Sequence, residues 1–207
     1  MKLRQANNPE STTKLAYIRE LPPMLKRRLH IILTLLIFGT GHCFAQSNDS
    51  IISDIRTKYQ HIRDNLKSYD TTMIDIWDES TEGGQGTAFY DGNSLRLIET
   101  IWFGETGKRK TEYYFDNGQL FFAFDTDYEY NRPIYWDEKK AKEFNDSITF
   151  DPNKTIVKED RYYFHNEKLI RWLDNDKKEI DLLLGTNSIV GQGLKAHAYK
   201  MKDKLKK

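Results

Sequence analysis

The sequence predicts an α+β protein in which an antiparallel β-meander is packed by an N-terminal amphipathic helix and by a C-terminal helix. Apolar residues recur at three- and four-residue steps near both ends of residues 46–207, and at every second residue in between. Turn motifs with Asp-Gly or Asn-Gly interrupt the alternating segments at regular intervals. Short, regular turns favour a meander, in which each strand pairs with its neighbours in the chain.

Length and composition exclude several classes of protein. The chain has 207 residues, of which 38% are hydrophobic, 30% charged and 13% aromatic, and these values suit one globular domain with appendages. Its formal net charge of +1 and mean hydropathy of −0.74 are unlike those of a polytopic membrane protein or a strongly basic nucleic-acid-binding protein. We therefore expect no nucleic-acid partner.

A leader precedes the predicted domain. Three basic residues at positions 26–28 are followed by an apolar run over residues 29–38 and by a short segment that ends in Ala45. This layout is typical of a secretory signal peptide, and we assign it to residues 24–45. The run is too short for a membrane helix, which needs about twenty apolar residues, so we expect no membrane span in the mature chain.

The leader also defines the expected start of the mature protein. Cleavage after Ala45 makes Gln46 the first mature residue, and residues 1–23 are interpreted as a non-native upstream extension. An alternative is lipidation of Cys43, although Thr40 stands where lipoprotein leaders carry an aliphatic residue. The sequence thus predicts an exported protein of the periplasm or extracellular space, with a lipid anchor at Cys43 as the alternative.

The near-zero net charge hides a segregated chain. Residues 46–207 hold 25 Lys and Arg against 29 Asp and Glu, and residues 46–194 hold 19 against 28, a net charge of −9. The mature protein is therefore an acidic body with a basic tail, which disfavours phosphate-rich partners. Cys43 is the only cysteine, so the mature domain is expected to be free of cysteine and of thiol chemistry.

The expected sheet domain covers residues 46–187. Residues 47–69 place their isoleucines on one stripe and are predicted to form the N-terminal helix. The strands expected in the meander are residues 73–77, 85–90, 94–103, 109–115, 119–125, 160–164 and 168–173. Residues 83–86 are rich in glycine, but both flanks are strand-like, so we expect a loop between strands rather than a phosphate cradle.

The remaining segments have weaker patterns. A proline restricts residues 128–136 to an edge strand or an irregular segment. Residues 137–145 are expected as a short helix, and residues 179–184 as a last strand. Residues 188–207 form the predicted C-terminal basic helix, which two glycines weaken at its start.

An internal repeat supports the meander. Residues 113–127 match residues 162–176 at a constant offset of 49, with seven identities in fifteen positions. Two copies of one hairpin are too few for a solenoid or a propeller. Together with the leader, Tyr-Tyr-Phe-Asp-Asn-Gly-Gln-Leu and Arg-Tyr-Tyr-Phe-His-Asn-Glu-Lys-Leu-Ile-Arg-Trp resemble small exported β-meander proteins common in Bacteroidetes that have no assigned function. The resemblance covers residues 47–184, implies export and a β-rich fold, and carries over no catalytic residue.

Aromatic residues are the most informative functional feature. Twenty-four of the 27 lie in the expected mature domain, several as adjacent pairs such as Phe121-Phe122. Because consecutive strand residues point to opposite faces, each pair is expected to place one ring on each side of the sheet. Rings on the second face need a cover, either the helices and a second sheet layer or an external ligand. The residues predicted for a binding face are Tyr90, Trp102, Tyr113, Tyr130, Arg132, Trp136 and Trp172.

Few motifs in this sequence indicate catalysis or metal binding. The sequence has no Gly-x-Ser-x-Gly elbow. The acidic segment 125–129 fails the calcium-loop pattern and is interpreted as a solvated strand end, so neither a metal nor a cofactor is predicted. Glu82, Glu99 and Glu112 lie near aromatics and form a candidate acidic pocket, since sugar hydrolases use two carboxylates.

The function that this sequence favours is a non-enzymatic binding or interaction module of the cell envelope. Its aromatic sheet face would take a protein, peptide or glycan partner. The alternative is a carboxylate-dependent hydrolase that acts on envelope polysaccharide or peptide.

Export can be tested directly. When the chain is produced with its leader in an exporting bacterium, the mature protein should be recovered outside the cytoplasm with Gln46 as its first residue, because the leader is removed after Ala45. Mass spectrometry of the intact protein and its N-terminal peptide checks this. An acylated Cys43 would establish the lipoprotein alternative, and an uncleaved cytoplasmic chain would contradict export.

Overall fold

The structure is a computed structural model that describes residues 41–77 and 80–206, with side chains from Asn48 onward. The predicted upstream extension and most of the predicted signal peptide lie outside the described residues. The chain divides into two compact units, Met1–Ser50 and Ile51–Lys207, and the second holds the whole sheet. Across the described ranges, no helix combines the length and hydrophobicity that crossing a membrane requires.

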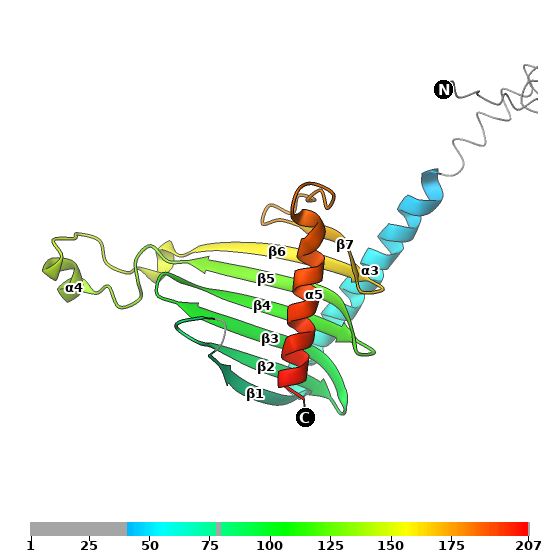
Figure 1. The fold of residues 1–207 in the computed structure, drawn as a ribbon, viewed down its shortest axis with the longest axis horizontal. Helices are drawn as coiled ribbons and strands as arrows, with labels where there is room; N and C mark the ends of the chain where they lie inside the picture. Colours follow the sequence, from blue (N-terminus) through cyan, green and yellow to red (C-terminus); the bar gives the residue numbers. More distant parts are fainter. Residues whose placement is uncertain (1–40, 78–79, 207) are drawn as a thin grey trace, which may run out of the picture. The chain divides into compact units, whose positions relative to one another are not determined.

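A seven-stranded antiparallel sheet forms the centre of the second unit (Figure 1). Each strand pairs with its neighbours in sequence, from β1 to β7 in order, so the predicted α+β meander is confirmed. The strands are β1 Asp70–Ile76, β2 Gly84–Asp91, β3 Ser94–Gly104, β4 Gly107–Asp116, β5 Gln119–Glu129, β6 Ile156–His165 and β7 Lys168–Leu173. The helices are α3 Gly41–Asn65, η1 Leu66–Ser68, α4 Glu138–Glu143, η2 Pro152–Lys154 and α5 Asn187–Lys204.

One predicted strand is absent, and segment 128–136 takes the irregular form that was one of its two predicted forms. Strand β5 runs on to Glu129, and the rest of segment 128–136 is irregular, because Pro133 has no N–H to give to a ladder. The last predicted strand, residues 179–184, is wrong: only one bridge forms, between Leu173 and Glu179. The side chain of Asp174 accepts hydrogen bonds from the backbone N–H groups of Asp176 and Lys178, and this tight turn ends the pairing.

The hairpin found twice in the sequence occurs three times in the structure, as β2–β3, β4–β5 and β6–β7. Each has a two-residue turn, at residues 92–93, 117–118 and 166–167. Both turn residues have positive φ in the second and third copies, as type I′ turns require. The first copy lies 25 residues before the second and shares only two of eight residues with it, so identity alone does not reveal it.

A β-bulge follows each of these turns. In the second hairpin Phe115 pairs with Leu120 and Tyr114 pairs with Phe122, which leaves Phe121 as an extra residue in β5. Arg96 and Ile170 are the extra residues of the other two hairpins. A bulge places two consecutive side chains on one face, and Phe121 and Phe122 do lie in the same core cluster. The prediction that each adjacent aromatic pair straddles the sheet is therefore wrong for this pair.

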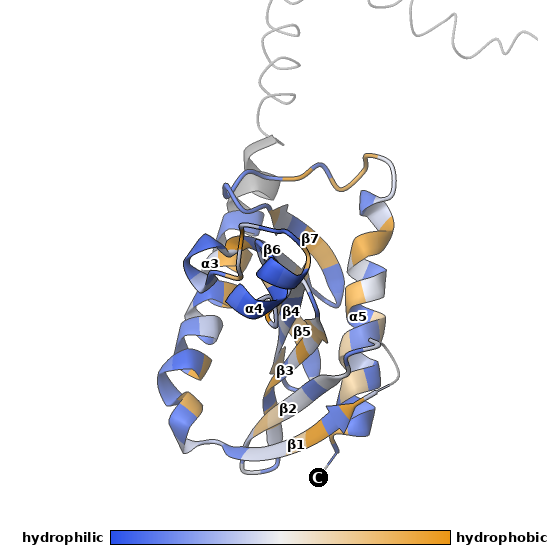
Figure 2. Cartoon of the chain, turned by 90° about the vertical axis from the view of Figure 1, so that its left-hand side faces the viewer, coloured by the Kyte–Doolittle hydropathy of each residue, from blue (hydrophilic) through white to orange (hydrophobic). Residues whose placement is uncertain are grey.

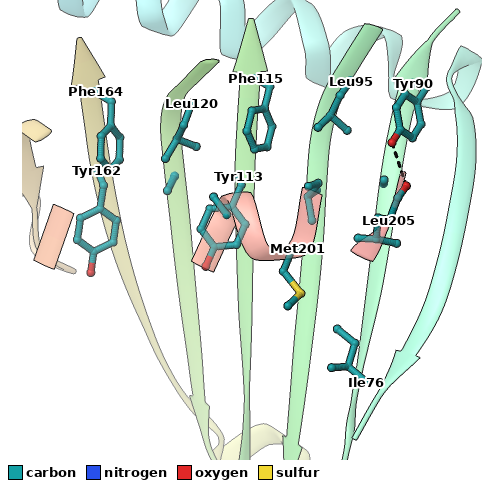
Figure 3. Close-up of a cluster of buried hydrophobic side chains, with 14 residues drawn as sticks. Ile76, Tyr90, Leu95, Tyr113, Phe115, Leu120, Tyr162, Phe164, Met201 and Leu205 are labelled. Atoms are coloured by element: carbon teal, nitrogen blue, oxygen red, sulfur yellow. Dashed lines mark hydrogen bonds between the residues drawn. The ribbon is translucent and has the colours of Figure 1, made fainter. Parts of the chain in front are cut away.

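Helix α5 covers one face of the sheet near the hairpin turns. Each hairpin gives this face an aromatic residue before its turn and a leucine after it, as Figure 3 shows for the hairpins β2–β3 and β4–β5. These residues are Tyr90 and Leu95, Phe115 and Leu120, and Phe164 and Leu169. Met201 of α5 and Leu205, which directly follows the helix, are fully buried in the same cluster. The Tyr90 hydroxyl donates to the carbonyl oxygen of Leu205 at 2.9 Å and so holds the end of the helix.

Helix α3 covers the opposite face, as Figure 2 shows. From Ile51 onward, its buried isoleucines pack on the aromatic residues that precede the bulges. Tyr59 makes edge-to-face contacts with Tyr114 and Phe122, at centroid distances of 5.0 and 5.3 Å. The rings that need a cover are thus largely covered by the protein's own helices. At the other end of the sheet, Phe103 and Val157 stay exposed.

The repeated aromatic position can be tested by truncation. Phe115→Ala should lower the free energy of unfolding by about 3–5 kcal/mol, because Phe115 is fully buried beneath α5. Phe144→Ala is the matched control, since Phe144 is 58% exposed, and it should change stability by less than about 0.5 kcal/mol. Urea unfolding of both variants measures the difference. Equal losses of unfolding free energy in the two variants would contradict the packing of α5 on the aromatic residues and leucines beside the hairpin turns.

Candidate functional site

A pocket of about 350 Å³ lies beside helix α5, where the covered part of this face ends. Strands β3, β4 and β5 form its floor, and α5 forms one wall. Its lining residues are Trp102, Arg109, Thr111, Tyr113, Asp125, Leu194 and His197. The volume falls within the range of about 300–1,000 Å³ that is common for small-ligand sites.

The aromatic wall of the pocket is Trp102, a predicted binding residue. A Cβ atom on Gly84 of the neighbouring strand would lie 2.6 Å from Cε3 of Trp102 and 2.7 Å from the carbonyl oxygen of Ile101. Glycine is therefore required at this position for the indole to pack against β2. Gly84 and Gly86 belong to β2, so the loop expected for the glycine-rich segment is wrong here.

The floor of the pocket holds a buried carboxylate. Asp125 is 5% exposed, and its Oδ1 accepts a hydrogen bond from the Thr111 hydroxyl at 2.9 Å. Its Oδ2 lies 2.9 Å from Nε of Arg109. Burial raises the pKa of Asp125, and the nearby Asp160 and Asp127 add to this effect, while Arg109 and Thr111 oppose it. The interpretation of segment 125–129 as a solvated strand end is therefore wrong at Asp125.

The second wall is the imidazole of His197 on α5. A hydrogen bond of 2.7 Å joins its Nδ1 to the hydroxyl of Tyr113, a predicted binding residue that is 2% exposed. The His197 ring also lies 6.0 Å from that of Trp102, edge to face. Tyr113 therefore positions the imidazole, and His197 and Trp102 flank the carboxylate floor.

Trp172 lies on the same face of the sheet, two strands beyond β5. Its Nε1 donates to Oδ1 of Asp160 at 2.7 Å, and its ring packs on Tyr162 at 5.3 Å. Asp160 is the cross-strand partner of Asp125. Burial raises the pKa of Tyr162 well above its ordinary value. Trp172 thus supports the carboxylate that neighbours the pocket floor.

Three other predicted binding residues form a separate cluster in the connection between β5 and β6. Nε of Arg132 and Nε1 of Trp136 both donate to Oδ2 of Asp146, at 2.9 and 3.2 Å. The ring of Tyr130 contacts that of Phe150 at 5.4 Å. These side chains fold the connection onto itself. With Tyr90 under the end of α5, the seven predicted residues therefore do not form one face.

The predicted acidic pocket is an ion-pair network on the α3 face. Glu99 and Glu112 are cross-strand partners, and Nζ of Lys110 lies 2.6 Å from the first and 2.8 Å from the second. Glu112 is buried, pairs with Arg63 at 3.3 Å and accepts a hydrogen bond from Tyr114 at 2.7 Å. Burial lowers the pKa of Lys110, but its hydrogen bonds to both carboxylates outweigh this effect and raise it.

Glu82 is exposed at the β1–β2 turn, apart from this pair. Glu99 and Glu112 are held by cations instead of facing a substrate cleft. The pocket residues that sequence reasoning did not select are Arg109, Thr111, Asp125, Leu194 and His197. Cross-strand register and the position of α5 bring them together, and neither is visible as a motif.

No family model, curated protein or solved structure matches this chain. The resemblance to exported Bacteroidetes proteins accordingly stays a prediction. Among the described side chains, those of residues 48–77 and 80–206, no three His, Cys, Asp or Glu are grouped in a way that would hold a metal ion.

The buried carboxylate can be tested by a neutral replacement. Asp125→Asn retains an acceptor for Thr111 and removes a charge that burial disfavours, so stability at pH 7 should stay level or increase. A raised pKa means that the folded protein holds this proton more tightly than the unfolded chain. The cost of ionisation is therefore present above the raised pKa and disappears as the pH falls below the ordinary value of 3.8.

Urea unfolding at pH 7 and pH 3 measures this difference, and the gap between variant and wild type should close at pH 3. Asp75→Asn, at an exposed position of β1 that does not act on the pKa of Asp125, is the control and should leave stability unchanged. A loss of about 3 kcal/mol in Asp125→Asn at pH 7 would contradict the account, because it would mark Asp125 as half of a stabilising buried ion pair.

Proposed function

We propose that this chain is an exported, non-enzymatic binding module of the cell envelope whose α5-side pocket binds a glycan. The observation that supports this proposal is the combination of an indole wall, a buried carboxylate and a guanidinium in one pocket of about 350 Å³. The leader supports export. The acidic body of residues 46–194 supports an uncharged or weakly charged partner.

The residues of the pocket suit the chemistry of a sugar ring. One face of a pyranose carries C–H groups that pack on an aromatic ring, which Trp102 offers. Hydroxyl groups both donate and accept, so a carboxylate and a guanidinium side by side can bind two neighbouring hydroxyls. Nε of Arg109 pairs with Asp125. Because the Arg109 side chain is 57% exposed, its other N–H groups are within reach of a ligand.

The unfavourable burial of a carboxylate is a further argument for ligand binding. Proteins commonly accept a destabilising group where function requires it. Asp125 is such a group, because burial raises its pKa despite Arg109 and Thr111. A ligand hydroxyl that donates to the carboxylate would offset part of that cost. The pocket is thus better suited to a polar ligand than to an apolar one.

A hydrolase acting on envelope polysaccharide or peptide is the second candidate. The raised pKa of Asp125 favours it, since a general acid must hold a proton near the working pH. Asp127, exposed two residues along the same strand face, is the carboxylate that would pair with it. Binding without cleavage distinguishes the two functions.

The proposal is tested with chitooligosaccharides, which are uncharged oligomers of N-acetylglucosamine, in isothermal titration calorimetry with the mature chain. Trp102→Ala should weaken binding at least tenfold, because it removes the wall on which the sugar packs. Trp77→Ala is the matched control: Trp77 is 75% exposed at the end of β1 and does not line the pocket.

Equal affinity of both variants, or no binding by the wild type, would contradict the glycan site. Mass spectrometry of the recovered oligosaccharides follows cleavage in parallel. If the wild type cleaves the glycan and Asp125→Asn does not, the protein is a hydrolase and not a non-enzymatic binding module.

A further inference from the structure

A second pocket, of about 160 Å³, lies on the opposite face of the sheet, beside helix α3. Its walls are apolar and mostly aromatic. They are formed by Ile55, Tyr59, Phe122, Phe124 and Tyr163. Arg56 and Arg161 also line it, and none of its lining residues is acidic. A small apolar pocket with two cations is complementary to an organic anion.

Arg161 is the central polar residue of this pocket. Its guanidinium lies 5.0 Å from the ring centroid of Phe124, its cross-strand neighbour, and its side chain is 20% exposed. Nη2 donates to a carboxylate oxygen of Glu159. Nη1 is buried and has no hydrogen-bond partner among the described residues. Buried donors without a partner are rare in folded proteins, so the hydrogen-bonding capacity of this guanidinium is only partly used within the described residues.

Arg56 adds a second cation at the rim. It is exposed, and within the described part of the chain it has no acidic partner. Two other basic residues of the same helix do have one: Lys58 pairs with Asp116 at 3.1 Å, and Arg63 pairs with Glu112 at 3.3 Å. The positive charge at this pocket is therefore less compensated than the charge elsewhere on α3.

We propose that this α3-side pocket binds a small monocarboxylate whose apolar part has the size of a phenyl ring. A cavity of about 150 Å³ lined by apolar residues is known to hold benzene, so a pocket of about 160 Å³ accommodates one such group. The carboxylate accepts charge-assisted hydrogen bonds from the Arg161 guanidinium. Glu159 already neutralises part of that guanidinium, which favours a monoanion over a dianion.

This site is independent of the glycan pocket, because the two pockets lie on opposite faces of the sheet. The test compares phenylacetate with phenylacetamide, its uncharged counterpart of equal size, by isothermal titration calorimetry of the mature chain. Phenylacetate should bind at least tenfold more tightly than phenylacetamide. Acetate, which has the charge without the ring, should also bind at least tenfold more weakly.

Variants locate the site. Arg161→Gln should reduce the affinity for phenylacetate to that for phenylacetamide, and Arg56→Gln should reduce it severalfold. Arg96→Gln is the matched control, since Arg96 lies on strand β3, is 28% exposed and pairs with Asp91 at 3.2 Å outside this pocket. Its affinity for phenylacetate should equal that of the wild type.

Circular dichroism confirms that each variant is folded. If Arg161→Gln does not fold, the side-chain N–H resonances of Arg161 in the wild type decide the matter: they should shift and saturate with phenylacetate. Resonances that do not move, equal affinities for the acid and the amide, or no binding of phenylacetate at 10 mM would each overturn the proposal.

Discussion

The β-bulge after each hairpin turn is the constraint on which both faces of this sheet depend. An unbulged strand sends alternate residues to opposite faces, so it delivers the same number of side chains to each. The extra residue of a bulge breaks that balance and adds one side chain to the α3 face. In the second hairpin this residue is Phe121, which lies beside Phe122 and widens the apolar surface under α3. The other face keeps one aromatic and one leucine per hairpin, and α5 packs on them.

This arrangement also determines where a ligand can enter. Because the bulges lie next to the turns, the apolar surface for both helices is concentrated at the turn end of the sheet. The α5-side pocket starts where α5 stops covering its face, at Trp102 and Asp125, and the α3-side pocket starts beside α3, at Phe124 and Arg161. Both pockets therefore combine core-like aromatic walls with charged strand residues that the helices leave reachable.

The meander could be predicted from the sequence, because alternation and Asn-Gly or Asp-Gly turns are local properties. The bulges could not, because a register shift depends on pairing between strands: Phe121-Phe122 has the same sequence pattern whether its rings lie on one face or on two. The turn of the first hairpin, β2–β3, was predicted, but its membership of the repeat was not, because only Asp91 and Leu95 are identical to the matching residues of the second copy.

The candidate site shows the same division. Trp102 and Tyr113 were identified by composition, since aromatics on a sheet need a cover or a ligand. Asp125 was misjudged because its burial comes from α5, 62 or more residues later in the chain, and from its β4 neighbours Arg109 and Thr111. The leucines and aromatic residues that hold α5 on the sheet are therefore also the reason why Asp125, a strand carboxylate, is buried at the floor of a pocket.

The placement of Phe121 tests the bulge account most directly. Nuclear Overhauser contacts of the two adjacent rings report which face each occupies. The account predicts contacts of Phe121 with Ile62, and of Phe122 with Tyr59, both on α3. Contacts of Phe121 with Met201 of α5 would place it on the other face, as in an unbulged strand, and would contradict the account.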